Sequence, residues 1–140
     1  TKRPDEDGVH FVDFETVLRM SDYLSLNCPL NDQTRHLIDG AALGKMKRTA
    51  FIINTARGAL IDEAALVQAL QNRRIGGAGL DVQEVEPLPD GSPLYTLDNV
   101  IITPHIGWRG LETRKRLVSI LKDNITAFVN GEPINRVDNI

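Results

Sequence analysis

The fold is decided by residues 50–58, which read Ala50-Phe51-Ile52-Ile53-Asn54-Thr55-Ala56-Arg57-Gly58. The first half is a continuous apolar run, the pattern of a strand that is buried on both faces of a parallel sheet. The second half is polar and places a guanidinium at Arg57 beside Gly58, where backbone or ligand can approach closely. This change from strand to loop indicates the carboxyl end of a parallel strand, where ligands bind in open α/β sheets.

The rest of the chain alternates between apolar runs and helical patterns. Strands are expected at 23–27, 50–54, 78–82 and 100–103. Helices are expected at 14–20, from Asp39 to about Met46, from Asp62 to a stop at Gly76-Gly77, and at 111–129 before Gly131. Asp13, Asp39 and Asp62 are the kind of residue that caps a helix N-terminus. The alternation predicts an α/β fold, a parallel sheet with right-handed crossovers and helices on both faces.

The segment between the last two predicted strands is a long loop rich in proline and acid, with Pro87, Pro89, Asp90 and Pro93. A loop of this length without structure of its own is usually functional or disordered. Glu84 and Glu86 at the start of this loop are therefore candidate functional residues.

The composition excludes several classes of protein. The chain has 140 residues, of which 41% are hydrophobic and 25% charged, and its net charge of −3 provides no basic footprint for nucleic acid. No apolar run approaches the roughly 18 residues that span a membrane, and residues 1–5 do not resemble a signal peptide. The single Cys28 excludes an intrachain disulfide and fits a reducing compartment, so we expect the cytoplasm.

Three side chains near strand ends can act together. Arg57 presents paired donors that match a carboxylate, and His105, in Thr103-Pro104-His105-Ile106-Gly107, can exchange a proton near neutral pH. Glu86, in Glu84-Val85-Glu86-Pro87, could orient the imidazole and stabilise its charged form. Together they predict a site that binds a carboxylate substrate and moves a proton.

Each of these residues also has an ordinary structural interpretation. Arg57 could pair at the surface with Asp62 or Glu63, and His105 could be a partly buried histidine bonded to a backbone carbonyl. Glu84 competes with Glu86 for the histidine, and both could be solvated loop acids.

Asp81 ends an apolar strand and needs partners, for which a ligand amide or a helix N-terminus are candidates. His10 and His36 have no acidic or cysteine companions at ligand spacing and are interpreted as incidental, so no metal site is predicted. Cys28 is interpreted as an inert thiol. The motifs of zinc proteases, redox dithiols, serine hydrolases and P-loop enzymes are missing from the sequence.

Four segments in order make the chain similar to the D-isomer-specific 2-hydroxyacid dehydrogenases, in the C-terminal part of that family's sequence. They are residues 22–30 with Thr34, residues 51–58, residues 79–82 with Glu86-Pro87-Leu88-Pro89, and residues 99–107. Within the family, the glycerate dehydrogenase/hydroxypyruvate reductase branch is nearest.

The resemblance implies a role for each motif residue. Arg57 would bind the substrate carboxylate and carbonyl oxygen, His105 would be the acid/base, and Glu86 would pair with it. The implied substrate is a small 2-hydroxy or 2-oxo acid such as hydroxypyruvate or glyoxylate, the cofactor is NAD or NADP, and the full-length enzyme would be a homodimer. Cofactor contacts are implied at Cys28, Pro29, Thr34, Thr55, Ala56, Arg57, Asp81, His105 and Gly107.

The resemblance also implies a partial Rossmann-type sheet in residues 1–110 and, in residues 111–140, a crossover helix and tail that return toward a substrate domain. The family's GxGxxG loop is missing from the sequence. We therefore expect a fragment that is inactive alone, and Lys2-Arg3 favours NADPH. The alternatives are a dinucleotide-sensing corepressor-like module and a poorly folded remnant.

Overall fold

The computed structural model describes residues 8–138. The chain divides into two compact units, of which the first ends at His105 and the second begins at Ile106. Lys2-Arg3, on which the NADPH expectation depends, lies outside the described residues. The expected helices and strands are confirmed, with small shifts at their ends. In chain order they are α1 (Phe14–Met20), β1 (Tyr23–Leu26), α2 (Gly40–Lys45), β2 (Phe51–Asn54), η1 (Gly58–Leu60), α3 (Glu63–Gln71), β3 (Gly77–Leu80), η2 (Pro93–Thr96), β4 (Val100–Ile102) and α4 (Leu111–Val129).

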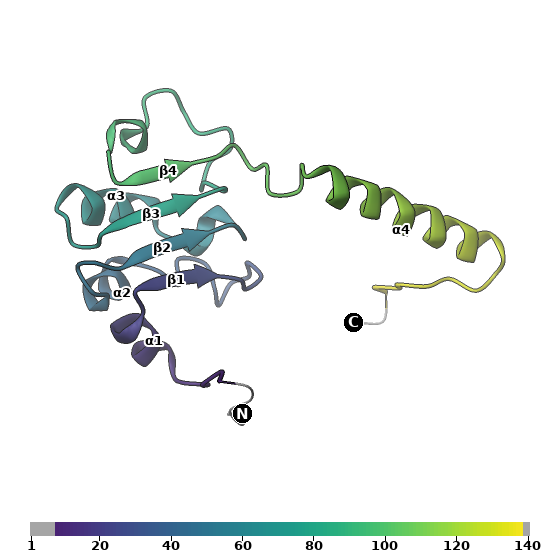
Figure 1. Ribbon diagram of the computed structural model, residues 1–140, viewed down its shortest axis with the longest axis horizontal. Helices are drawn as coiled ribbons and strands as arrows, with labels where there is room; N and C mark the ends of the chain where they lie inside the picture. Colours follow the sequence, from purple (N-terminus) through teal and green to yellow (C-terminus); the bar gives the residue numbers. More distant parts are fainter. Residues whose placement is uncertain (1–7, 139–140) are drawn as a thin grey trace. The chain divides into compact units, whose positions relative to one another are not determined.

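The first unit is built on a parallel sheet of four strands in the order β1-β2-β3-β4. The strands lie side by side and point the same way (Figure 1). One row of the register joins Leu24, Ile52, Ala78 and Val100 across the whole sheet. This arrangement confirms the α/β fold with a Rossmann-like parallel sheet, and it sets the four strand ends in one line.

The core of this unit lies on one face of the sheet. Leu24 and Ile52 are buried there together with Leu43 of α2 and Leu66 of α3. The opposite face exposes Tyr23, Phe51 and Ile101 by 72%, 40% and 73%, and the Tyr23 and Phe51 rings stack at 5.7 Å. The expectations that β2 is buried on both faces and that helices cover both faces are therefore wrong for the described part of this unit.

The order of the strands explains this one-sided core. Successive strands always advance in the same direction across the sheet. Right-handed crossovers that advance in one direction place their helices on one face. The contacts between α1 and α2 and between α2 and α3 agree with this.

The helices of the first unit begin where the sequence predicts. Asp13, Asp39 and Asp62 each accept a hydrogen bond from a backbone N–H in the first turn, at 2.9, 2.8 and 3.0 Å. Such caps stabilise a helix by about 1 kcal/mol each. The predicted stop at Gly76-Gly77 is wrong, because α3 ends earlier, at Gln71, and Gly77 already belongs to β3.

The long loop before β4 is ordered by its own apolar residues. Leu88 and Leu94 are buried in the core of the unit, and Leu94 lies in the short helix η2. The backbone N–H of Leu94 donates to the Ser92 hydroxyl. The loop is therefore a packed part of the fold that holds the segment around Glu86.

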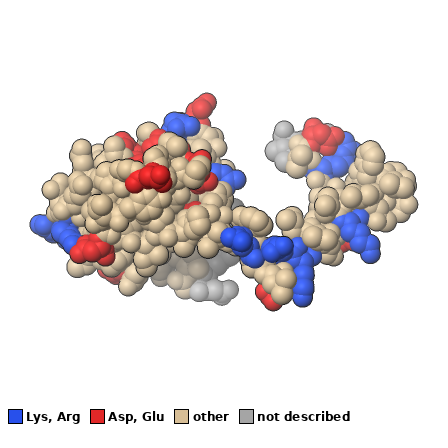
Figure 2. All heavy atoms as spheres, turned by 90° about the horizontal axis from the view of Figure 1, so that it is seen from above, with Lys and Arg blue, Asp and Glu red and all other residues tan. Residues whose placement is uncertain are grey.

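The second unit contains α4 with residues on either side of it. Gly131, at φ +77°, follows the helix in the left-handed conformation that glycine tolerates. None of the residues of α4, all of which the structure describes, is buried. The apolar side chains along the helix are therefore exposed, among them Leu117, Ile120, Leu121, Ile125 and Phe128. Lys and Arg side chains gather along this unit (Figure 2).

Candidate active site

Backbone hydrogen bonds join the chain segments at the ends of β2, β3 and β4. The N–H of Asp81 donates to the Asn54 carbonyl at 2.9 Å, and that of His105 to the Asp81 carbonyl at 2.8 Å. These bonds continue the pattern of the sheet beyond β2, β3 and β4. The polar residues that follow the strands therefore lie on one rigid edge, as parallel topology requires.

His105 and Glu86 form a direct pair at this edge. The Nδ1 atom of His105 lies 2.8 Å from the Oε2 atom of Glu86. Their side chains are 44% and 35% exposed, so the pair is held by the protein but open to a ligand. The structure thus brings these two predicted residues together, whereas Glu84 pairs with a different histidine.

Glu86 is held from two sides. Its Oε1 atom accepts a hydrogen bond from the backbone N–H of Gln83 at 3.1 Å, while its Oε2 atom meets the imidazole. The hydrogen bond with His105 is the main cause that lowers the pKa of Glu86 below its ordinary value of 4.5, and burial opposes it. The Gln83 N–H and the charges of His105 and Arg57 lower this pKa further. Glu86 is therefore a carboxylate at neutral pH.

Arg57 lies on a loop whose shape is set by Asn54. This residue is 1% exposed, and its side chain accepts from the Ala56 N–H at 3.1 Å and donates to the Arg57 carbonyl at 2.8 Å. The side-chain amide thus closes a turn directly after β2, a common function of asparagine. The turn leaves Arg57 exposed, with Nη1 donating to the Ala56 carbonyl at 2.7 Å.

The surface pairs considered for Arg57 do not form. The carboxylate of Asp62 accepts from the N–H of Ala65 at the start of α3, and that of Glu63 accepts from the N–H of Glu84 at 3.2 Å. The positive charge of Arg57 is instead the smallest of the causes that lower the pKa of Glu86.

Gly58 lets the Arg57 loop approach the backbone of Gln83 and Glu84 closely. A Cβ atom at this position would lie 1.8 Å from the Gln83 carbonyl oxygen and 2.5 Å from the Glu84 nitrogen. No side chain fits at these distances. The two loops are therefore in backbone contact one residue away from Arg57.

Asp81 is buried, with 8% of its surface exposed, and it accepts a short hydrogen bond from the Thr103 hydroxyl. Thr103, at the end of the neighbouring strand, is therefore a hydrogen-bond partner of the buried carboxylate. The sequence analysis considered a ligand amide and a helix N-terminus as partners and did not predict this threonine. The pair fixes a carboxylate between β3 and β4.

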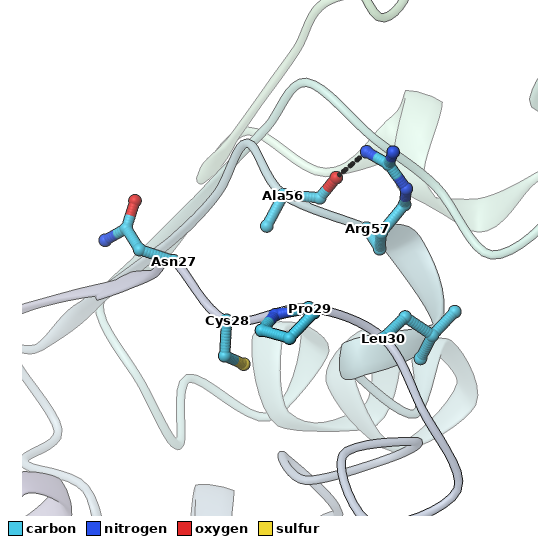
Figure 3. A pocket seen from close by; sticks show the side chains of 6 residues that line it. All are labelled: Asn27, Cys28, Pro29, Leu30, Ala56 and Arg57. Carbon is cyan, nitrogen blue, oxygen red and sulfur yellow. Dashed lines mark hydrogen bonds between the residues drawn. The ribbon is translucent and has the colours of Figure 1, made fainter. Parts of the chain in front are cut away.

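A cavity of about 490 Å³ opens beyond the ends of β1 and β2. It is lined by Asn27, Cys28, Pro29, Leu30, Ala56 and Arg57 (Figure 3). The figure shows the Arg57 guanidinium folded back over the Ala56 carbonyl. Four of the predicted cofactor contacts, Cys28, Pro29, Ala56 and Arg57, thus surround one cavity.

The other predicted cofactor residues lie in different places. Thr34 supports the cavity from behind, because its hydroxyl donates to the Pro29 carbonyl at 2.7 Å. Thr55 is exposed in the loop after β2 and is not among the residues that line the cavity. Gly107 belongs to the second unit.

A second cavity of about 350 Å³ lies beside the His105–Glu86 pair. It is lined by Gln83, Glu86, Pro87, Leu88, Tyr95, Ile102, Pro104 and His105. Its walls are largely apolar, so a small molecule there would meet the imidazole and carboxylate in a partly desolvated space.

The sequence interpretation missed a second histidine–carboxylate pair. The Nε2 atom of His36 lies 2.7 Å from the Oε1 atom of Glu84, a residue 48 positions away. Nothing local to His36 indicates such a partner. Gln83, whose N–H holds Glu86, was missed for the same reason.

Metal ligands do not gather anywhere in residues 8–138, since no group of three or more His, Cys, Asp or Glu side chains could hold an ion. Within the same residues, every helix is too short or too polar to cross a membrane.

The comparisons with known proteins identify the family. Residues 1–107 match the family model described as "D-isomer specific 2-hydroxyacid dehydrogenase, NAD binding domain". The chain belongs to the D-isomer-specific 2-hydroxyacid dehydrogenase family. The resemblance inferred from the four sequence segments is therefore confirmed, and so is the expectation of a domain that binds a nicotinamide dinucleotide.

Individual members of this dehydrogenase family show the same relationship. A glycerate dehydrogenase of Methylorubrum extorquens is 49% identical over 95% of this chain and 42% of its own length. A glyoxylate/hydroxypyruvate reductase B of Serratia proteamaculans is 48% identical over 85% of this chain and 37% of its own. These relatives confirm the predicted branch. The chain spans about two fifths of the length of the curated relatives it matches.

A solved structure gives the same picture in three dimensions. An acyclic imino acid reductase in complex with NADPH and D-Arg superimposes with a TM-score of 0.86 at 35% identity. The superposition covers 95% of this chain and 42% of that one. The fold of this chain is therefore that of the NAD-binding domain of its family.

The residues of the first unit fit one end of such a dinucleotide. The larger cavity combines the Arg57 guanidinium and the Asn27 amide with apolar walls from Pro29, Leu30 and Ala56. It lies beyond the carboxyl ends of parallel strands, where nucleotides bind in this class of sheet. Apolar walls suit the face of an aromatic ring, and the polar groups suit its amide and ribose.

Proposed function

We propose that this chain provides the cofactor-binding part and the acid/base residues of an oxidoreductase that interconverts a 2-oxo acid and a D-2-hydroxy acid. The observation that supports it is the contact of His105 with Glu86, together with the charge of Arg57 that helps to lower the pKa of Glu86. The imidazole would move a proton, the carboxylate would orient the imidazole, and the guanidinium would bind the carboxylate of the substrate. Hydroxypyruvate and glyoxylate are the proposed substrates, because the relatives include a glycerate dehydrogenase and a glyoxylate/hydroxypyruvate reductase.

Arg57 would bind the substrate. Its guanidinium presents several N–H donors, of which the Nη1 group already donates to the Ala56 carbonyl. Paired donors match the two oxygens of a carboxylate, and each charge-assisted bond contributes about 1.5–3 kcal/mol. A substrate anchored here would present its carbonyl group toward the His105–Glu86 pair.

His105 would move the proton. Because Nδ1 faces Glu86, the proton that the substrate oxygen receives during reduction would leave from Nε2. In the oxidative direction, Nε2 would accept the proton of the hydroxyl group. Glu86 would keep the ring in one orientation and favour the imidazolium form. A general acid/base in this position contributes typically about 10²–10⁴-fold to the rate.

A bound nicotinamide dinucleotide would supply or accept the hydride. The residues proposed to hold it are Cys28, Pro29, Thr34, Thr55, Ala56, Arg57, Asp81, His105 and Gly107. The position of Asp81 supports its share in this role, because its buried carboxylate is fixed by Thr103 between two strand ends. Both NAD and NADP remain candidates.

Further parts of the proposal concern the whole protein. Residues 1–110 would be the cofactor-binding part, and residues 111–140 would return toward a substrate domain. Supporting observations are the family match over residues 1–107 and the exposed apolar side chains of α4, which suit a partner surface. We also propose a homodimer and a cytoplasmic location, the latter supported by the free thiol of Cys28.

The test is a chimera. Residues 8–138 would replace the matching segment of the Methylorubrum extorquens glycerate dehydrogenase, which would supply the remaining three fifths of the protein. Oxidation of NADH and NADPH is then measured with hydroxypyruvate and glyoxylate. Turnover is expected, and it should fall by about 10²–10⁴-fold in a His105→Asn chimera. A folded, cofactor-binding chimera without turnover on either acid would contradict the proposal.

The isolated 140-residue chain provides a second measurement. We expect it to oxidise NADH only at the background rate, because it spans about two fifths of its relatives. Turnover by the chain alone would contradict this expectation. Size-exclusion chromatography on the same sample distinguishes a defined species from the aggregation expected of a poorly folded remnant.

A further inference from the structure

A second histidine–carboxylate contact links the two loops that flank the site. His36 lies in the loop after β1, and its Nε2 atom is 2.7 Å from the Oε1 atom of Glu84 in the loop after β3. The two side chains are 38% and 29% exposed. The contact is thus partly buried and spans 48 positions of sequence.

His36 is itself fixed firmly by the backbone. Its N–H donates to the Ala59 carbonyl at 2.8 Å, and the N–H of Ile38 donates to the Leu60 carbonyl at 3.0 Å. His36 also adopts φ +51°, in the left-handed region that residues with a Cβ atom rarely occupy. A residue in this conformation is held there by its surroundings. The backbone that carries the imidazole is therefore well fixed.

Glu84 lies beside the residue that orients Glu86. Its own N–H donates to the Glu63 carboxylate at 3.2 Å, and its neighbour Gln83 donates its N–H to Glu86 at 3.1 Å. Gln83 is also fixed by its side chain, which is 7% exposed and donates to the carbonyls of Leu80 and Thr103. A shift of Glu84 would thus displace the peptide that holds Glu86.

We propose that His36 and Glu84 form a positioning pair, which fixes the 83–86 loop so that the carboxylate of Glu86 stays on the imidazole of His105. The catalytic meaning of this contact rests on the proposed function, in which the His105–Glu86 pair moves the proton. His36 and Glu84 would touch neither substrate nor cofactor.

The test follows the titration of Glu86 by carboxyl ¹³C NMR on the 140-residue chain. In Glu84→Ala the pair is lost, and we expect the pKa of Glu86 to rise toward its ordinary value of 4.5 as the contact with His105 loosens. Removal of a neighbouring negative charge alone would lower this pKa. The sign of the change therefore separates positioning from simple electrostatics.

Two further variants make the result specific. Glu84→Gln keeps an oxygen that can accept from the His36 ring, so the pKa of Glu86 should stay at or below its wild-type value. His36→Gly suits the left-handed backbone while removing the imidazole, so the chain should stay folded and Glu86 should titrate as in Glu84→Ala. If Glu84→Ala fails to fold, an unchanged pKa of Glu86 in His36→Gly still overturns the proposal.

The matched control is Asp22→Ala, which removes the partner of Lys47, at 2.8 Å, in another partly exposed side-chain pair of the same unit. It should leave the titration of Glu86 unchanged. An unchanged pKa in both Glu84→Ala and His36→Gly would overturn the positioning role. Because the measurement needs no turnover, that result is distinct from an inactive chimera, which would contradict the proposed function.

Discussion

The two histidine–carboxylate pairs of this protein have the same chemistry and different surroundings. His105 and His36 have φ values of +52° and +51°, and their contacts with Glu86 and Glu84 measure 2.8 and 2.7 Å. His105 uses Nδ1, the ring nitrogen nearer the backbone, whereas His36 uses Nε2 at the tip of the ring. His105 also lines a cavity of about 350 Å³, of which His36 is not a lining residue.

In the roles proposed for the two pairs, the same kind of side-chain contact serves two purposes. A carboxylate at Nδ1 orients the ring and directs its tip away from the carboxylate, toward a reacting group. A carboxylate at Nε2 occupies the tip and turns the histidine into a link between loops. The nitrogen that is engaged therefore distinguishes the two pairs better than their distances do.

The largest effect is expected from His105→Asn in the chimera. Asparagine tolerates the left-handed backbone, so the fold should persist while the acid/base is lost. The turnover number should fall by about 10²–10⁴-fold. His36→Asn is the matched variant at the other pair, and its loss in the same steady-state assay should be smaller. Equal losses would remove the distinction between the pairs.

Arg57→Lys tests whether the cation near Glu86 recognises a carboxylate by its paired donors. Lysine keeps the charge but loses the planar fork. With one charge-assisted bond lost, at about 1.5–3 kcal/mol, kcat/KM should fall roughly 10- to 150-fold. Arg19→Lys, on α1 in a surface pair with Glu15, is the control. An Arg57→Lys chimera with unchanged kcat/KM would show that the fork is not needed.

Gly58→Ala tests the backbone contact between the Arg57 loop and residues Gln83 and Glu84. The added methyl group would lie 1.8 Å from the Gln83 oxygen, so unfolding in urea should show a loss of about 1–3 kcal/mol. Gly44→Ala is the control, because Gly44 lies in α2 and a Cβ atom there would have no neighbour within 4 Å. Alanine should stabilise that helix by about 0.5–1 kcal/mol. Similar stabilities of the two variants would argue against the close approach.

The smallest effect concerns acid stability. The folded-state pKa of Glu86 lies below its ordinary value of 4.5, so its contribution is complete above that value. The contribution is lost as the pH falls through the lower folded-state pKa. Glu86→Gln should therefore be slightly less stable at neutral pH and lose less stability on acidification. Urea unfolding at several pH values measures this, with Glu132→Gln as control. Parallel curves for wild type and Glu86→Gln would contradict it.

Local signals were sufficient to predict much of the fold. Asp13, Asp39 and Asp62 mark the helix starts because a cap acts within one turn. The apolar run before Asn54 marks β2 for a similar reason. The loop around Leu88 and Leu94 was harder, because its order comes from packing against the core and not from its turn residues.

Long-range contacts explain what the sequence could not show. Glu84 and Glu86 stand in the same acidic loop, and only the positions of His36 and His105 decide which carboxylate pairs with which ring. Asp81 and Thr103 meet across 22 positions because two strands lie side by side. The uncovered sheet face follows from the strand order, which a single apolar run such as β2 does not specify.

The glycine at position 58 also has an evolutionary consequence. The backbones of the Arg57 loop and of residues 83–84 lie so close that no Cβ atom fits between them, so the two loops cannot change their paths independently. Any larger residue at this position would have to be accompanied by a compensating retreat near Gln83, and that retreat would reach Glu86. We expect insertions between the second and third strands of related chains to avoid residues 56–58, and the two loops to change length only together.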